Sequence, residues 1–271
     1  MCNACVIESV KQQMLSRRQL LKGAAVGAAS VAGLGVSTQM AHATSHSSVS
    51  DMSHELHEQF PTFFGEQQFF MESIFNYEEH KFNVNELRLM EHTGTHVDAP
   101  LHFSADGQSV AQIPVENLVC PLCVIDIRAR AAEDADTLVT PDDLKAWISA
   151  NGPIPDNACV AMNSGWSDLV NSEKFRNVQD EKMHFPGFHI EATTMLLEET
   201  GAAGLAVDTL SLDHGISADF ATHYAWLPAG RWGIECLANL DSVPAAGSTL
   251  VVGAPKFRGA SGGPARVFAM S

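Results

Sequence analysis

Short apolar runs with a strand-like composition recur from about residue 87 to the C-terminus. Runs of this kind, rich in Val, Ile and Leu and bounded by turn residues, predict buried β-strands. We expect strands at 87–91, 124–127, 159–163, 205–207, 232–237, 250–252 and 266–269.

Two helices are predicted between these strands, and both have clear end signals. Thr140 is a suitable N-cap for a helix that begins at Pro141 and ends near Gly152. A second helix is predicted over residues 190–200, with Gly201 as its C-terminal stop. This mixture of strands, helices and turns fits one domain of the α/β or α+β type.

The N-terminal segment has the composition of an export signal. Arg17 and Arg18 precede a stretch rich in Ala, Gly and Val, and Ala41-His42-Ala43 has the small-x-small pattern of a cleavage site. The paired arginines resemble a bacterial twin-arginine signal, which directs a protein to the periplasm. The expected organisation is an export signal over 1–43, a flexible lead-in over 44–58 and a folded domain over 59–271.

Charge and hydropathy narrow the range of partners. The chain of 271 residues carries 16 Lys and Arg against 32 Asp and Glu, with a net charge of −16 and no basic block. Nucleic-acid binding needs many cations that neutralise phosphates, so we do not expect DNA or RNA as a partner. No apolar run reaches the roughly 18 residues of a spanning helix, so we expect no membrane association after signal removal.

Cys120 and Cys123 have the spacing of a redox motif, but a strand-like run follows them instead of a helix. Because reactive thiolates usually sit at helix N-termini, a structural role, which includes an adventitious disulfide in an oxidising compartment, is favoured over a redox role.

Aromatic residues are concentrated between Phe60 and Tyr77. They could serve core or oligomer packing, or they could form a wall over a substrate pocket. With Trp166, we take Phe63 and Phe64 as candidate substrate-binding residues for an aryl compound.

The segment from His92 to His102 is the most informative part of the chain. It holds four potential metal ligands or proton carriers, His92, His96, Asp98 and His102, with Gly94 and Pro100 between them. In an extended chain, residues 92, 96 and 98 point to one side, so two imidazoles and a carboxylate converge. This donor set suits Zn²⁺ or Mn²⁺, which can acidify a bound water.

The same segment resembles the metal-binding signature of the cyclase family of metal-dependent hydrolases, which includes bacterial kynurenine formamidases and isatin hydrolases. It matches His-x-Gly-Thr-His-x-Asp-x-Pro-x-His at every fixed position. Further similarity to the family lies in 163–166, 185–188, 207–213 and 261–267. The resemblance implies a swivelling β/β/α fold of the α/β class and a homo-oligomer.

In the two-metal formamidases of this family, the first site uses the residues that match His92, His96 and Asp98. By this resemblance, Asp98 would bridge to a second ion held by a later His and a Glu twelve residues beyond it. His223 and Glu235 have this separation. Other members use a single manganese, so one or two divalent ions, Zn²⁺ or Mn²⁺, are expected. The position that matches the catalytic His of the family is His102.

These observations predict a metal-dependent hydrolase that cleaves an amide C–N bond of a small molecule, an aromatic amide or a lactam, with His102 as general base. Two alternatives remain: an exported metal-binding protein without catalysis, and a cyclase or dehydratase of the same family.

Overall fold

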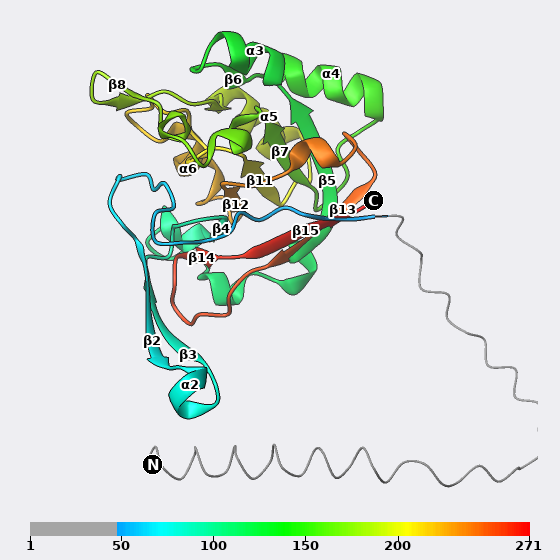
Figure 1. Ribbon diagram of the computed structural model, residues 1–271. Coiled ribbons are helices and arrows are strands. Elements are labelled where there is room, and N and C mark those ends of the chain that lie inside the picture. The colour runs from blue at the N-terminus through cyan, green and yellow to red at the C-terminus, as the bar shows by residue number, and fades with distance from the viewer. Residues whose placement is uncertain (1–47) are drawn as a thin grey trace, which may run out of the picture. The chain divides into compact units, whose positions relative to one another are not determined.

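The computed structural model describes residues 48–271, so the predicted export signal lies outside the described part. Within that part, one sheet of nine strands forms the framework (Figure 1). In spatial order its strands are β1 (Val49–Asp51), β15 (Arg266–Met270), β13 (Ser248–Gly253), β5 (Val119–Asp126), β7 (Cys159–Asn163), β11 (Gly204–Val207), β12 (Trp232–Glu235), β4 (His96–Asp98) and β14 (Gly262–Pro264). The class is mixed α/β, as the sequence predicts.

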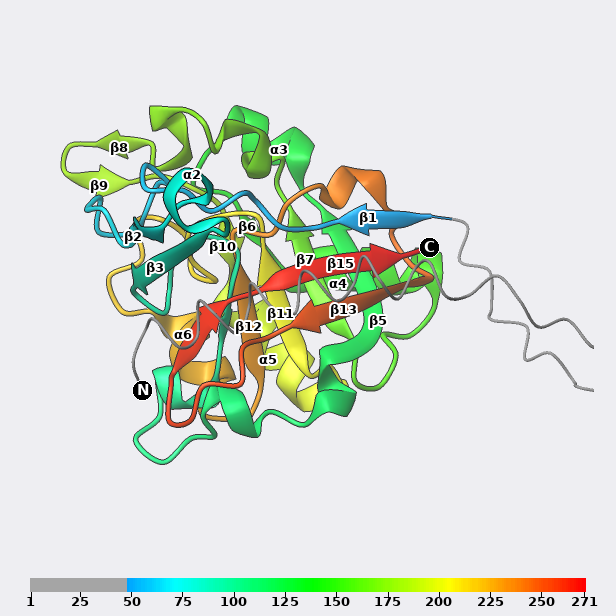
Figure 2. The ribbon, with the colours of Figure 1, turned by 60° about the horizontal axis from the view of Figure 1, so that its bottom comes forward.

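The four central strands β5, β7, β11 and β12 run parallel, and the strands on both sides of them are antiparallel (Figure 2). All five residues of β7 are buried. Because parallel strands are covered on both faces, they read as continuous apolar runs, which is why β7 was predicted with its observed bounds.

Helices cover one face of this sheet. They are α3 (Arg128–Glu133), α4 (Pro141–Asn151), α5 (Ile190–Glu199) and α6 (Ala221–Trp226). Leu144 of α4 and Leu196 of α5 are buried in one cluster with Val160 of β7. Ala161, the next residue along β7, belongs to a second cluster with Val97 and Ile234. The alternation of β7 between two cores is the period of two expected of a strand.

The end signals of α4 are confirmed in atomic detail. The Asp143 carboxylate accepts hydrogen bonds from the backbone N and side-chain Oγ1 of Thr140, at 2.8 and 2.9 Å. This capping box satisfies amides that a helix start leaves without partners. Gly152, with φ at +93°, follows the last turn.

The predicted flexible lead-in is wrong for the described part of its range. Val49–Asp51 forms β1, which pairs with β15, and Met52 is fully buried. The polar composition of this segment concealed an edge strand, because an edge strand needs only one apolar side and can expose the other. The folded part of the chain therefore begins before residue 59.

Smaller elements complete the chain. Residues 72–86 make up a separate compact unit with α2 (Tyr77–His80), in which Phe75 packs against Phe82 with ring centroids 5.1 Å apart. The remaining strands are β2 (Phe69–Phe75) paired with β3 (Val84–Leu89), β6 (Leu138–Val139) with β10 (Gly187–Phe188), and β8 (Val178–Gln179) with β9 (Lys182–Met183). The 3₁₀ helices span Pro100–His102, Val110–Gln112, Val115–Leu118, Trp166–Leu169, Glu173–Phe175 and Leu240–Ser242.

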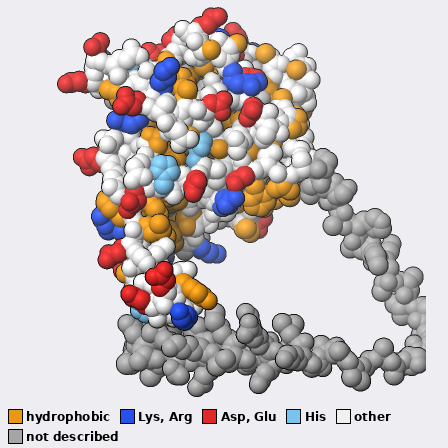
Figure 3. Space-filling model, in the orientation of Figure 1, with side chains coloured by type: hydrophobic (Ala, Val, Ile, Leu, Met, Phe, Trp, Pro, Cys, Tyr) orange, Lys and Arg blue, Asp and Glu red, His pale blue; other side chains and the backbone are white. Residues whose placement is uncertain are grey.

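Among residues 48–271, no helix is both long and apolar enough to cross a bilayer. Figure 3 shows Asp and Glu side chains dispersed over one face, interspersed with Lys and Arg.

Cys120 and Cys123 lie on β5 as buried free thiols. Burial raises the pKa of each thiol to about 12, so both are un-ionised packing residues at neutral pH. The structural role favoured from the sequence agrees with this, and the adventitious disulfide is not formed.

Candidate metal centre

Two of the predicted ligands, His96 and Asp98, lie on β4, between β12 and β14. Residues two apart on a strand share a face, so both side chains project to the same side of the sheet. On β12, Glu235 pairs with His96. All three side chains are buried, which places two carboxylates and an imidazole in a region with little access to water.

His92 reaches the same place by a turn. The extended conformation predicted from His92 onward holds only for His96–Asp98, because Gly94 has φ at +68° and the chain bends there. Glycine adopts this left-handed conformation without steric cost. As a result, His92 Nδ1 lies 2.6 Å from Asp98 Oδ1. The predicted convergence is present, although the predicted backbone conformation is wrong.

The donor atoms form two groups that share Asp98. The first contains His92, His96 and Asp98, and the second contains Asp98, His223 and Glu235. Within each group the candidate ligand atoms lie within 4.8 Å of one another. The structure thus brings together all five residues that the sequence singled out as ligands.

The second group draws on three elements, with Asp98 on β4, His223 on α6 and Glu235 on β12. His223 lies on α6, and its Nε2 is 3.1 Å from Glu235 Oε1 and 3.7 Å from Asp98 Oδ2. Glu235 Oε1 also accepts a hydrogen bond from the backbone N of Leu212, at 3.1 Å.

Two histidines in this cluster, His96 and His223, have raised pKa values. Burial alone lowers the pKa of His96, but the Asp98 and Glu235 carboxylates, each with an oxygen 3.4 Å from His96 Nε2, outweigh it and raise this pKa to about 10. The pKa of His223 is likewise raised well above its usual value, since Asp213, Asp98 and Glu235 together outweigh burial. Burial would raise the pKa of Asp98, yet its three histidine neighbours hold it well below the usual range. The cluster therefore favours a cation, either a proton or a metal ion.

In two histidines, a hydrogen bond fixes the outer ring nitrogen, which is the one that points away from the carboxylates of the cluster. His96 Nδ1 is 2.8 Å from the carbonyl of Gly94, and His223 Nδ1 is 2.6 Å from Asp213 Oδ2. A carbonyl or carboxylate only accepts, so each Nδ1 carries a proton and each Nε2 faces the carboxylates. Partners of this kind are what orient histidine ligands at metal sites.

Two buried atoms in the cluster have no hydrogen-bond partner, His96 Nε2 and Asp98 Oδ2. An unpartnered buried polar atom is costly, and a divalent cation between these atoms would remove the cost. Imidazole nitrogen with carboxylate oxygen is the donor chemistry of Zn²⁺ and Mn²⁺ sites. The residues present therefore fit a divalent metal.

His102, predicted as the base, lies in the 3₁₀ helix Pro100–His102 beside the cluster and outside both donor groups. Its ring stacks on that of His92, with centroids 3.8 Å apart. Burial lowers the pKa of His102 to about 4, so the ring is neutral at pH 7. Among the described residues neither of its ring nitrogens has a hydrogen-bond partner, so a substrate or water can use them.

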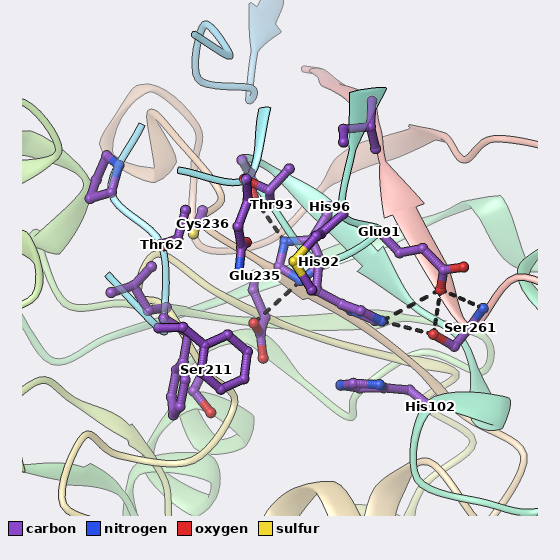
Figure 4. A pocket seen from close by; sticks show the side chains of 18 of the residues that line it. Thr62, Glu91, His92, Thr93, His96, His102, Ser211, Glu235, Cys236 and Ser261 are labelled. Atoms are coloured by element: carbon purple, nitrogen blue, oxygen red, sulfur yellow. Dashed lines mark hydrogen bonds and ion pairs between the residues drawn. The ribbon is translucent and has the colours of Figure 1, made fainter. Parts of the chain in front are cut away.

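A cavity of about 710 Å³ opens over the cluster. Figure 4 shows His92, His102 and Glu235 among the residues that line it, with Glu91 and Ser261 beside one nitrogen of the His92 ring. Most of the remaining lining residues are aromatic or apolar, among them Phe63, Phe64, Phe103, Leu210 and Phe220. A largely apolar cavity with a few polar groups at one end is typical of small-molecule sites.

Of the predicted substrate-binding residues, Phe63 and Phe64 line the cavity and Trp166 does not. Trp166 is buried in a separate core cluster with Phe60 and Phe175, and its indole N–H donates to the carbonyl of Phe175 at 2.9 Å. The structure therefore does not bring Trp166 to the cavity, because its side chain packs in the core.

Sequence reasoning gave no role to five residues that shape the site. Phe103 and Phe220 line the cavity, Asp213 holds His223, and Glu91 and Ser261 adjoin His92. Asp213 and Ser261 lie within stretches that resembled the family, so the signal was present without a role attached. Phe220 has φ at +51°, a conformation that a bulky residue rarely adopts. No sequence pattern predicts this conformation.

Comparisons with known proteins agree with this site. The Cyclase family matches residues 50–214. The isatin hydrolase of Roseibium aggregatum is 32% identical over 199 residues, covering 70% of this chain and 75% of that protein. The kynurenine formamidase of Salinibacter ruber is 29% identical over 194 residues, covering 70% of this chain and 81% of that protein.

Among solved structures, isatin hydrolase A from Labrenzia aggregata bound to benzyl benzoate superimposes with a TM-score of 0.78. It is 36% identical, and the match covers 82% of this chain and 93% of that one. The chain belongs to the Cyclase family. The predicted fold is confirmed, and so is the prediction of a metal-dependent hydrolase of an amide C–N bond, given these relatives and the His, Asp and Glu cluster.

Proposed function

We propose that the protein hydrolyses the C–N bond of a small aryl amide, with a planar lactam such as isatin as the first substrate to test and an N-formyl aryl amine as the second. The observation that carries this is the position of the donor cluster and His102 at one end of an aromatic cavity. The isatin hydrolases and kynurenine formamidases among its relatives support both substrate types.

The bound metal would be Zn²⁺ or Mn²⁺, held by His92, His96 and Asp98, and the group of Asp98, His223 and Glu235 offers a place for a second ion. When bound, such an ion supplies a Lewis acid for the carbonyl oxygen and lowers the pKa of a water toward 7.

The protein's own residues provide the proton transfers and the orientation. His102, neutral at pH 7, accepts a proton from the attacking water on a ring nitrogen and gives it to the departing amide nitrogen. Phe63 and Phe220, with ring centroids 5.9 Å apart, offer flat surfaces against which an aryl ring can pack. The apolar cavity also limits competing water.

Export and assembly form part of the same proposal. Residues 1–43 would act as a twin-arginine signal that takes the protein to the periplasm, and the mature chain would form a homo-oligomer. The paired arginines and the small-x-small site support the first, and the family resemblance supports the second. Cell fractionation tests the location, and light scattering of the purified protein tests the assembly.

The test of function is a hydrolysis assay of the purified protein with isatin and with N-formyl aryl amines, with Zn²⁺ or Mn²⁺ added. Ring opening of isatin is followed by its visible absorbance. Turnover of either substrate that disappears in Asp98→Asn supports the proposal, and Asp126→Asn, at an exposed carboxylate, is the matched control. If neither substrate is hydrolysed by protein shown to hold the metal, the proposed substrate class is wrong.

A further inference from the structure

His92 differs from the other two histidine ligands in what holds its outer nitrogen. A backbone carbonyl holds His96 and a buried carboxylate holds His223. His92 Nε2 instead lies 2.9 Å from the hydroxyl of Ser261, which is 169 residues away in sequence. Figure 4 shows this contact on the side of the His92 ring that faces Glu91.

Glu91 determines which way the Ser261 hydroxyl points. The Glu91 carboxylate accepts two hydrogen bonds from Ser261, one from its backbone N at 2.8 Å and a short one from its Oγ. A hydroxyl has one proton, and here that proton is directed at Glu91. The Oγ can then only accept from His92, so His92 Nε2 carries a proton and Nδ1 faces Asp98.

The backbone around Ser261 is built into the sheet that carries the ligands. The Ser261 carbonyl accepts from the backbone N of Ala99 at 2.9 Å, and β14 then pairs with β4. Gly262 follows, and a Cβ on it would lie 2.6 Å from Cε1 of His92 and 2.4 Å from the carbonyl of Val97. The backbone therefore fixes the position of the Ser261 hydroxyl beside the His92 ring. A side chain larger than that of glycine at position 262 would displace the ring.

We propose that Ser261 and Glu91 are positioning residues for the metal centre: the Glu91-oriented hydroxyl of Ser261 fixes the ring and the tautomer of His92, so that its Nδ1 is presented to the divalent cation. Glu91 acts only through Ser261. The inference rests on the metal site and is independent of which amide is the substrate.

The first experiment measures the Zn²⁺ dissociation constant by competition with a chromophoric chelator, for the intact protein and for Ser261→Ala. Loss of a hydrogen bond that orients a ligand typically weakens metal binding by about 10- to 100-fold, and we expect a loss in this range. Ser242→Ala, at an exposed serine away from the cavity, is the matched control and should bind Zn²⁺ like the parent.

A double-mutant cycle tests whether Glu91 acts through Ser261. Glu91→Ala alone should weaken Zn²⁺ binding, and adding it to Ser261→Ala should bring no further loss, because the hydroxyl it orients is already absent. Glu91→Gln keeps an acceptor for Ser261 and removes the charge. It should retain most of the affinity, whereas a purely long-range charge effect would make it equal to Glu91→Ala.

A spectroscopic readout separates orientation from general destabilisation. In the Zn²⁺-loaded protein, long-range ¹H–¹⁵N correlation of the imidazoles should show His92 protonated at Nε2, and His96 and His223 protonated at Nδ1. In Ser261→Ala only the His92 signal should shift or broaden. The proposal is overturned if Ser261→Ala binds Zn²⁺ within about twofold of the parent, or if His92 carries its proton on Nδ1. Neither measurement involves a substrate, so failure of the hydrolysis assay would leave this result standing, and the reverse.

Discussion

His92 and His102 lie with their rings stacked, at a centroid distance of 3.8 Å and an angle of 21° between planes. One belongs to a donor group for the metal and the other to neither group. The stacking places an un-ionised imidazole directly beside the cluster. Replacing His102 should therefore affect catalysis without removing a metal ligand.

Replacing His102 by Ala should lower kcat at least about 100-fold, because general acid–base transfer is worth about 10²–10⁴ in rate. Metal content should stay at the level of the parent, since His102 lies in neither donor group. Steady-state assays with elemental analysis of the same samples measure both. His80→Ala, in the separate unit of residues 72–86, is the control. An unchanged kcat would remove His102 from the mechanism.

The two kinds of aromatic residue should respond differently to truncation. Phe63 lines the cavity, so Phe63→Ala should raise KM for an aryl substrate with little change in the free energy of unfolding. Trp166 is a core residue, so Trp166→Ala should cost about 3–5 kcal/mol in the free energy of unfolding. Denaturant titrations and KM measurements on both variants check this. Equal effects of the two changes on KM would contradict the placement of Trp166.

Asp208 provides a pH dependence of stability. Burial raises the pKa of its carboxyl from 3.8 to about 6, despite hydrogen bonds from the backbone N and Oγ of Ser164 and the backbone N of Trp166. As the pH rises from about 4 to about 6, the unfolded chain loses this proton while the folded chain retains it. The contribution of Asp208 to stability therefore falls over this window, by roughly 3 kcal/mol, and is constant above it.

The comparison that isolates this contribution is with Asp208→Asn, which keeps an acceptor for the two backbone amides but does not titrate. Denaturant unfolding of both proteins at pH 4, 5, 6 and 7 gives the difference in free energy. The intact protein should lose stability relative to Asp208→Asn between pH 4 and pH 6. A difference that does not vary with pH would show that the carboxyl has an ordinary pKa.

Most of the framework could be predicted from the sequence because its signals are local. β7, buried on both faces, reads as an apolar run, and α4 carries its cap at Thr140 and its stop at Gly152. The edge strand β1 was missed because its residues are mostly exposed, so their polarity resembles that of a loop. Its pairing with β15 is a contact between the two ends of the described chain.

The candidate site shows the same division between local and non-local information. His92, His96, Asp98 and His102 lie within one motif, so their spacing alone indicated shared chemistry. The contact between His92 and Ser261 depends on how β14 pairs with β4, which spacing does not encode. In the same way, the role of Asp213 follows from its place beside α6.

The central claim is that the cluster around Asp98 holds a divalent cation on which hydrolysis depends. The most direct measurement is the rate of isatin hydrolysis by protein stripped with a chelator and then titrated with Zn²⁺ or Mn²⁺, with bound metal counted in parallel. The account predicts no turnover in the stripped protein, recovery in proportion to the metal bound, and no recovery in Asp98→Asn. Full turnover by protein shown to be metal-free would contradict it.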